Sequence, residues 1–151
     1  MDNGFAESEG MRNLKYLLGI DLGTSGTKTV LFEETGRAVA SETIEYPLYQ
    51  PKNGWAEQEP EDWWNAARDT VKAVIAKSGV KPEDVKGVGI SGQMHGLVLL
   101  DREGRVLRRS ILWCDGRTQE ECDEITQTIG KERLIELSAN PALTGFTAGK
   151  I

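Results

Sequence analysis

The stretch between two apolar runs near the start of the chain has the residue types that bind a phosphate. Asp21 follows the apolar run 16–20, and a second apolar run follows at 30–32. Gly23 and Gly26 lie between them, where a missing side chain lets backbone N–H groups approach an anion closely. Hydroxyl groups and a cation complete the set: Thr24, Ser25, Thr27 and Lys28. Because a carboxylate at a strand end can hold a hard cation, directly or through water, phosphate with Mg²⁺ fits this turn; a solvated surface hairpin is the alternative.

This turn differs from the phosphate-binding loops of other folds. It contains neither G-x-G-x-x-G nor G-x-x-x-x-G-K-[ST], and it leads into a strand, whereas those loops lead into a helix. Residues 145–150 are superficially similar to the second motif. They have one residue too few between their glycines, and Ile151 stands where Ser or Thr is needed, so we reject that assignment.

Residues 91–96, with the sequence Ser-Gly-Gln-Met-His-Gly, form the second stretch that can bind a ligand. They follow an apolar run, at an expected strand end, where ligands of α/β sheets collect. Gln93 and His95 can donate to and accept from sugar hydroxyls, and Met94 can supply an adaptable apolar wall. A structural role is the alternative for His95, which is the single histidine of the chain.

Apolar spacing predicts the elements that position these residues. Strands are expected at 16–20 and 30–32, joined by a tight turn whose glycines adopt positive φ, and a third strand at 38–46 completes an antiparallel meander. Residues 60–77 place apolar side chains at helical spacing, begin with acids and end before Gly79, a predicted glycine cap. Residues 85–91 are expected to form a strand parallel to the first and central in the sheet.

Further along, a turn at 101–105 is expected to lead into a return strand at 106–112. A helix then runs to about Ile129, and a shorter helix follows at 131–137. Trp113 and Asp115 stand between the strand and the first of these helices, from which they could reach the same site as His95. Strand-end packing for Trp113 and capping of the helix by Asp115 are the alternative roles.

Length and charge exclude several classes of partner. The chain has 151 residues, enough for one domain, and a net charge of −6 without a basic tract, so neither nucleic acid nor an anionic membrane is expected as a partner. No apolar run approaches the roughly 20 residues that a membrane span needs. Residues 1–13 are acidic, unlike a signal or transit peptide, and we expect a disordered lead-in with Met11 as an alternative start.

The cysteines indicate a reduced protein. Cys114 and Cys122 form no C-x-x-C motif, and two cysteines with one histidine are too few for a structural zinc site. We therefore expect a cytoplasmic protein with free thiols.

Residues 18–32, Leu-Gly-Ile-Asp-Leu-Gly-Thr-Ser-Gly-Thr-Lys-Thr-Val-Leu-Phe, resemble the first phosphate-binding segment of the actin-like ATPase superfamily, which includes sugar kinases, heat-shock chaperones and actin. The resemblance implies an α/β fold, a ribonuclease-H-like mixed sheet with flanking helices. It also implies ATP and Mg²⁺ as cofactors, with Asp21 placing the metal through water. The turn at 23–28 would then face the β- and γ-phosphates.

Residues 91–96 resemble the xylulokinase branch of the carbohydrate kinase family, in which the matching Met and His contact the ketose. Glycerol kinases carry Arg-Glu where Met94 and His95 stand. Residues 54–60 and the Trp-rich helix start are also similar to the xylulokinase branch. The family usually has Asn where Cys114 stands, so any hydrogen bond of that Asn is lost here.

The resemblance covers residues 16–151 and corresponds to the first part of a two-domain kinase. It implies that residues 14–151 are the N-terminal part of the sugar-binding domain, and that the general-base Asp, a second phosphate loop and the adenosine pocket lie beyond residue 151. We therefore expect a fragment of a D-xylulose kinase that is inactive alone, with uncovered apolar surface that favours self-association. The alternatives are another sugar or polyol kinase of the family, or a non-catalytic binding module with the same fold.

Overall fold

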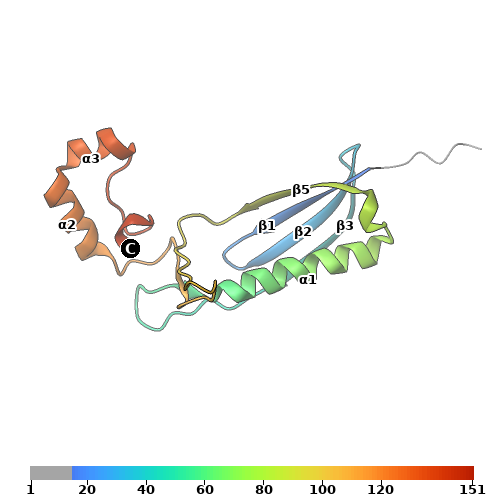
Figure 1. Ribbon diagram of the computed structural model, residues 1–151, viewed down its shortest axis with the longest axis horizontal. Coiled ribbons are helices and arrows are strands. Elements are labelled where there is room, and N and C mark those ends of the chain that lie inside the picture. The colour runs from blue at the N-terminus through green and yellow to red at the C-terminus, as the bar shows by residue number, and fades with distance from the viewer. Residues whose placement is uncertain (1–14) are drawn as a thin grey trace, which may run out of the picture.

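The computed structural model describes residues 15–151, so the predicted lead-in at 1–13 lies outside the described residues. Figure 1 shows a twisted sheet with one long helix along it and two shorter helices beyond the end of the fifth strand. The strands are β1 (Tyr16–Leu22), β2 (Gly26–Glu33), β3 (Ala38–Glu45), β4 (Glu57–Gln58), β5 (Val85–Gly92) and β6 (Ser110–Ile111). The helices are α1 (Pro60–Ser78), α2 (Gln119–Ile129) and α3 (Lys131–Ser138), with 3₁₀ turns η1 (Pro82–Asp84) and η2 (Ala148–Lys150).

The main sheet has four strands in the order β3-β2-β1-β5. The predicted antiparallel meander of β1, β2 and β3 is confirmed, and β5 is parallel to β1, with Leu22 opposite Gly92. The predicted central position of β5 is wrong, because no other strand within residues 15–151 pairs with its outer side. Val88 and Ile90 on this edge strand are exposed, and self-association through them stays a prediction.

Helix α1 covers one face of the sheet, over β2 and β3 (Figure 1). Between helix and sheet, the hydroxyl groups of Thr29 and Thr70 form a buried hydrogen bond of 2.7 Å. The centre of the core is a cluster of three side chains: Leu18, Leu31 and Val74. The predicted glycine cap is confirmed, since Gly79 has a φ of 68° and its N–H donates to the carbonyl of Ile75. None of the helices within residues 15–151 has the length and hydrophobicity of a membrane-spanning segment.

The turn between β1 and β2 does not use the positive φ that we predicted for its glycines. Neither Gly23 nor Gly26 has a left-handed backbone. Gly26 is needed instead for close approach, because a Cβ there would lie 2.7 Å from the carbonyl oxygen of Ile44 in β3. The glycine therefore lets the turn end of β2 lie directly against the neighbouring strand.

Replacing Gly26 tests this reading of the turn. We expect Gly26→Ala to lower the free energy of unfolding by about 2 kcal/mol, because the added methyl group must displace backbone. Gly89→Ala is the matched control, since its Cβ would lie 4.0 Å from the Leu18 carbonyl oxygen, an ordinary van der Waals distance. Urea denaturation measures both variants, and an equal effect would contradict the steric explanation.

Residues 97–112 are less regular than predicted. The return strand expected at 106–112 is wrong in extent, because only Ser110–Ile111 forms a strand, which pairs with β4. Isolated bridges join Leu97 to Ile111 and Leu100 to Val106. Ile111 is therefore paired on both sides, with β4 and with Leu97, while the hairpin between 97 and 111 is held only by isolated bridges. The helices predicted after residue 118 and at 131–137 are confirmed as α2 and α3.

Candidate functional site

The two stretches singled out in the sequence meet at one hollow. It has a volume of about 370 Å³ and lies where the parallel strands β1 and β5 end. Its lining combines the start of the phosphate-like turn with the second stretch and one tryptophan: Gly23, Thr24, Gly92, Gln93, Met94, His95 and Trp113. A second hollow of about 360 Å³ shares Gln93 and His95 and adds Trp63. The fold thus brings two of the predicted phosphate residues, Gly23 and Thr24, together with four of the predicted sugar residues.

A buried glutamine that the sequence reasoning missed joins these two stretches. The side chain of Gln58, in β4, is fully buried. Its Nε2 donates to the carbonyl oxygen of Thr24 at 2.7 Å, and its Oε1 accepts from Gln93 Nε2 at 2.9 Å and from Trp63 Nε1 at 3.0 Å. One side chain therefore fixes the turn after β1 relative to the residue that follows β5.

Thr24 adds a second link across the hollow. Its hydroxyl donates to Gln93 Oε1 at 3.3 Å and accepts from Trp113 Nε1 at 3.1 Å. Trp113 and Met94 nevertheless expose at least half of their surface. Hydrogen bonds of Thr24 thus fix the walls of the hollow, while the exposed surfaces of Trp113 and Met94 can contact a ligand. This combination suits a ligand with both hydroxyl groups and C–H faces.

The predicted phosphate side chains outside the hollow lie in three places: in the core, at the tip of the turn and on the face of the sheet opposite α1. Thr27 is fully buried, and its hydroxyl donates to Tyr46 Oη at 3.5 Å, so its side chain does not reach the surface of the turn. Burial raises the pKa of Tyr46, whose hydroxyl in turn donates to the carbonyl of Gly23 at 2.5 Å. The phenol of Tyr46 therefore holds the turn from the core side. Ser25 is exposed at the tip of the turn, beside Thr24.

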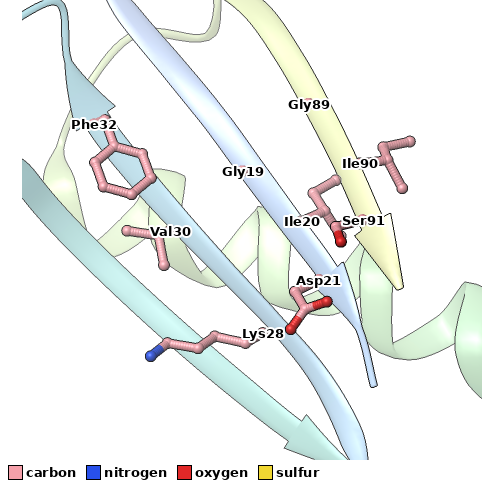
Figure 2. Close-up of a pocket in the computed structure, with 9 residues that line it drawn as sticks. All are labelled: Gly19, Ile20, Asp21, Lys28, Val30, Phe32, Gly89, Ile90 and Ser91. Carbon is pink, nitrogen blue, oxygen red and sulfur yellow. The ribbon is translucent and has the colours of Figure 1, made fainter. Parts of the chain in front are cut away.

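Asp21 and Lys28 lie on the face of the sheet opposite α1. They are direct neighbours across β1 and β2 and line an open depression of about 400 Å³ together with Val30 and Phe32 (Figure 2). Figure 2 shows the side chain of Asp21 close to the end of β1, with Lys28 alongside. Most of the other lining residues are apolar or glycine.

The side chains near the turn fit Mg²⁺ better than a metal ion that needs all of its ligands from the protein. Within residues 15–151, no group of three or more His, Cys, Asp or Glu side chains could hold a metal ion. Mg²⁺ keeps several waters and is usually bound by one or two carboxylates together with substrate phosphates. The exposed carboxylate of Asp21, beside the turn, fits that mode.

Asp115 is held by the protein itself. Its carboxylate accepts from the Ala56 N–H at 2.6 Å and from Arg117 Nη2 at 2.7 Å. Burial alone raises the pKa of Asp115, but the hydrogen bonds from Arg117 and Ala56 outweigh it and hold the pKa below its ordinary value. The predicted N-cap role of Asp115 is wrong, because Thr118 occupies that position and no side chain caps α2. A role toward the sugar stays a prediction.

Arg117 extends this buried cluster. Its Nη1 lies 2.8 Å from Glu57, and its guanidinium lies 3.5 Å above the ring centre of Trp55. Glu57 precedes Gln58 in β4, so the ion pairs fix the short strand that presents the glutamine to the hollow. Residues 54–60 were singled out in the sequence, but their residue types did not indicate that the side chain of Gln58 would be the one that points toward the hollow.

The mixed sheet with flanking helices is that of a domain of the actin-like ATPase type. The chain belongs to the FGGY family of carbohydrate kinases, because residues 16–151 match the model of the N-terminal domain of that family. Membership implies ATP as the phosphoryl donor of the family reaction.

Three comparisons illustrate the similarity. Xylulose kinase of Bacillus subtilis is 44% identical over 138 residues, which cover 91% of this chain and 28% of the relative. The crystal structure of a xyloylose (xylulose) kinase from Brucella ovis superposes with a TM-score of 0.82 at 39% identity, covering 89% of this chain and 28% of that chain. Glycerol kinase of Paenarthrobacter aurescens is 31% identical over 138 residues, 91% of this chain and 27% of the relative. The chain thus spans less than a third of the length of these curated relatives.

Proposed function

We propose that this chain is the sugar-binding part of a kinase that transfers the γ-phosphoryl group of ATP to D-xylulose and forms D-xylulose 5-phosphate. The observation that carries the proposal is the shared hollow, in which Thr24 of the phosphate-like turn lines the same space as Gln93 and His95. Phosphoryl transfer depends on holding the acceptor hydroxyl and the phosphate close together, which such a hollow does. The 44% identity to a xylulose kinase supports the choice of sugar.

The residues divide the work by their chemistry. Gln93 and His95 hydrogen-bond sugar hydroxyls, and Met94 and Trp113 cover a C–H face of the sugar. Backbone N–H groups of the turn at 23–28, with the hydroxyls of Thr24 and Ser25, face the phosphates. Lys28 adds positive charge. Asp21 holds Mg²⁺ through water, and the metal when bound neutralises phosphate charge.

The general base of this reaction comes from outside the 151 residues in this proposal. None of the described residues that line the hollow is a carboxylate, and the histidine among them is assigned in this proposal to hydrogen bonding with a sugar hydroxyl. A hydroxyl that attacks a phosphoryl group gives up its proton, so the reaction needs such a base near the sugar. We therefore expect sugar binding by this chain without turnover, and measurable ATP-dependent phosphorylation by the chain alone would contradict this part.

The sugar site can be tested through the single histidine of the chain. We expect D-xylulose to shift the ring signals of His95 in ¹H–¹³C NMR spectra, and glycerol to leave them unchanged. His95→Ala should weaken D-xylulose binding about tenfold by calorimetry, because a hydrogen-bonding group is lost. Thr128→Ala, at an exposed position on α2, serves as the control. Equal binding by wild type and His95→Ala would remove His95 from the site.

A different sugar or polyol is the second candidate. It is favoured by the 31% identity to a glycerol kinase over the same part of the chain. Met94 and His95 argue against glycerol, since glycerol kinases carry Arg-Glu there. Titration with D-xylulose, D-ribulose, gluconate and glycerol separates these substrates. A response to one of the last three alone would replace D-xylulose.

A further inference from the structure

His95 adopts a backbone conformation that is uncommon for residues other than glycine. Its φ is +64°, in the left-handed region where a Cβ crowds the backbone. Such a conformation persists only where the surrounding structure imposes it. The contacts that can impose it come from residues 145–150, which the sequence analysis set aside as a rejected phosphate loop.

These residues hold both the backbone and the ring of His95. Lys150 Nζ donates to the carbonyl oxygen of His95 at 2.8 Å and to that of Gly145 at 2.9 Å. The hydroxyl of Thr147 also donates to the carbonyl of His95, at 3.4 Å. The ring of Phe146 lies 4.7 Å from the imidazole, centre to centre, with an interplanar angle of 51°. Donors and an aromatic contact from one short segment therefore converge on His95.

Lys150 is poorly placed for any other task. It is only 8% exposed, and its hydrogen bonds in the described residues go to main-chain carbonyls. Burial lowers the pKa of Lys150, against the opposing effect of the negative charge of Asp115. An ammonium group has donors only, so the carbonyl of His95 is a partner that matches it. The buried ammonium group of Lys150 thus holds main-chain carbonyl groups that lie beside the hollow.

The segment itself rests on rigid neighbours. A Cβ on Gly145 would lie 2.8 Å from the carbonyl oxygen of Trp113, and one on Gly149 would lie 3.1 Å from Cys122 Sγ in α2. Residues 145–150 are therefore packed between α2 and the main chain of Trp113. They touch the backbones of two residues, Trp113 and His95, that form walls of the hollow.

We propose that residues 145–150 form a brace that sets the walls of the hollow, and that Lys150 is the positioning residue that holds His95 in the left-handed conformation. The effect on sugar binding rests on the proposed function, whereas the effect on His95 itself does not. Loss of the ammonium group leaves the carbonyl of His95 with one weak donor, so the backbone can relax to a negative φ and turn the imidazole away.

The experiment compares Lys150→Met with Lys72→Met, the same change at an exposed position on α1. The intraresidue HN–Hα nuclear Overhauser effect of His95 is strong at positive φ and is the first readout. We expect Lys150→Met to weaken this effect, to shift the single set of histidine ring signals and to raise the Kd for D-xylulose about tenfold. Lys72→Met should leave all three unchanged.

Each outcome decides one part of the proposal. If Lys150→Met keeps the strong HN–Hα effect and the wild-type ring signals, Lys150 does not position His95. If D-xylulose does not bind to the wild-type chain, the sugar assignment is wrong. The HN–Hα effect of His95 still shows whether residues 145–150 hold its backbone. Should Lys150→Met not fold, Thr147→Val removes the other donor and should weaken the same effect partially; an unchanged spectrum there, in a folded protein, would also overturn the brace.

Discussion

Gln58→Glu is expected to destabilise the protein by about 3 kcal/mol at neutral pH, although the two side chains have nearly the same shape. The substitution replaces the Nε2 donor with an acceptor, so the carbonyl oxygen of Thr24 loses its 2.7 Å hydrogen bond and faces a buried carboxylate. Gln93 and Trp63 can still donate to the other oxygen. The turn should therefore separate from β5, and D-xylulose binding should weaken at least about tenfold.

Gln127→Glu, at an exposed position on α2, controls for the added charge. Chemical denaturation at pH 8 and pH 5 gives a further check. The introduced carboxyl is buried, so its pKa in the folded state is raised and it becomes protonated as the pH falls. A protonated carboxyl can donate to Thr24 again, so the destabilisation should shrink at pH 5. A loss of stability that is equal at both pH values would contradict this mechanism.

Asp115→Ala is expected to lower the free energy of unfolding by about 3 kcal/mol, because it breaks a buried ion pair and leaves the Ala56 N–H without its acceptor. The side chains involved are nearly inaccessible, at 0% exposure for Asp115 and 11% for Arg117. Asp69→Ala is the matched control, since the pair of Arg68 and Asp69 is more than 40% exposed on both sides. We expect that control to leave stability almost unchanged.

The contribution of the Asp115 carboxylate to the free energy of unfolding should also depend on pH in the acid range. The pKa of Asp115 is lower in the folded state than in the unfolded chain, so its contribution is complete above the unfolded pKa of about 4 and is lost as the pH falls below that value. The stability difference between wild type and Asp115→Ala should therefore narrow progressively as the pH falls below about 4. A difference that stays constant over this range would mean that packing, and not charge, accounts for the effect.

Local patterns predicted most of the main sheet and helix. The meander, α1 with its Gly79 cap and the parallel β5 follow from alternation, helical spacing and glycine chemistry, all of which act over a few residues. The errors arose where segments distant in the sequence meet. Ser110–Ile111 pairs with β4 in addition to the bridge from Ile111 to Leu97, and Gly26 of the first turn allows close contact with β3; local turn preferences predict neither contact.

In the candidate site, too, some residues could be predicted from the sequence and others could not. Gly23, Thr24, Gln93, Met94, His95 and Trp113 were named from residue type and do meet at one hollow. Gln58 and Lys150 were missed as parts of the site, because each acts on main-chain carbonyls of other segments. Residue type shows which side chains can bind a ligand. Main-chain carbonyls occur at every residue, so their partners become visible only in three dimensions.

The hollow also has a consequence for the order of folding. Its two cross-links at Thr24 join residues 69 and 89 positions apart, to Gln93 and Trp113. The meander and α1 close through short loops, whereas these links require long loops to close, and such contacts form slowly. A chain in which only β1 to α1 has assembled thus lacks the binding hollow altogether. A sugar that binds it would select the completely folded state and shift the folding equilibrium toward it.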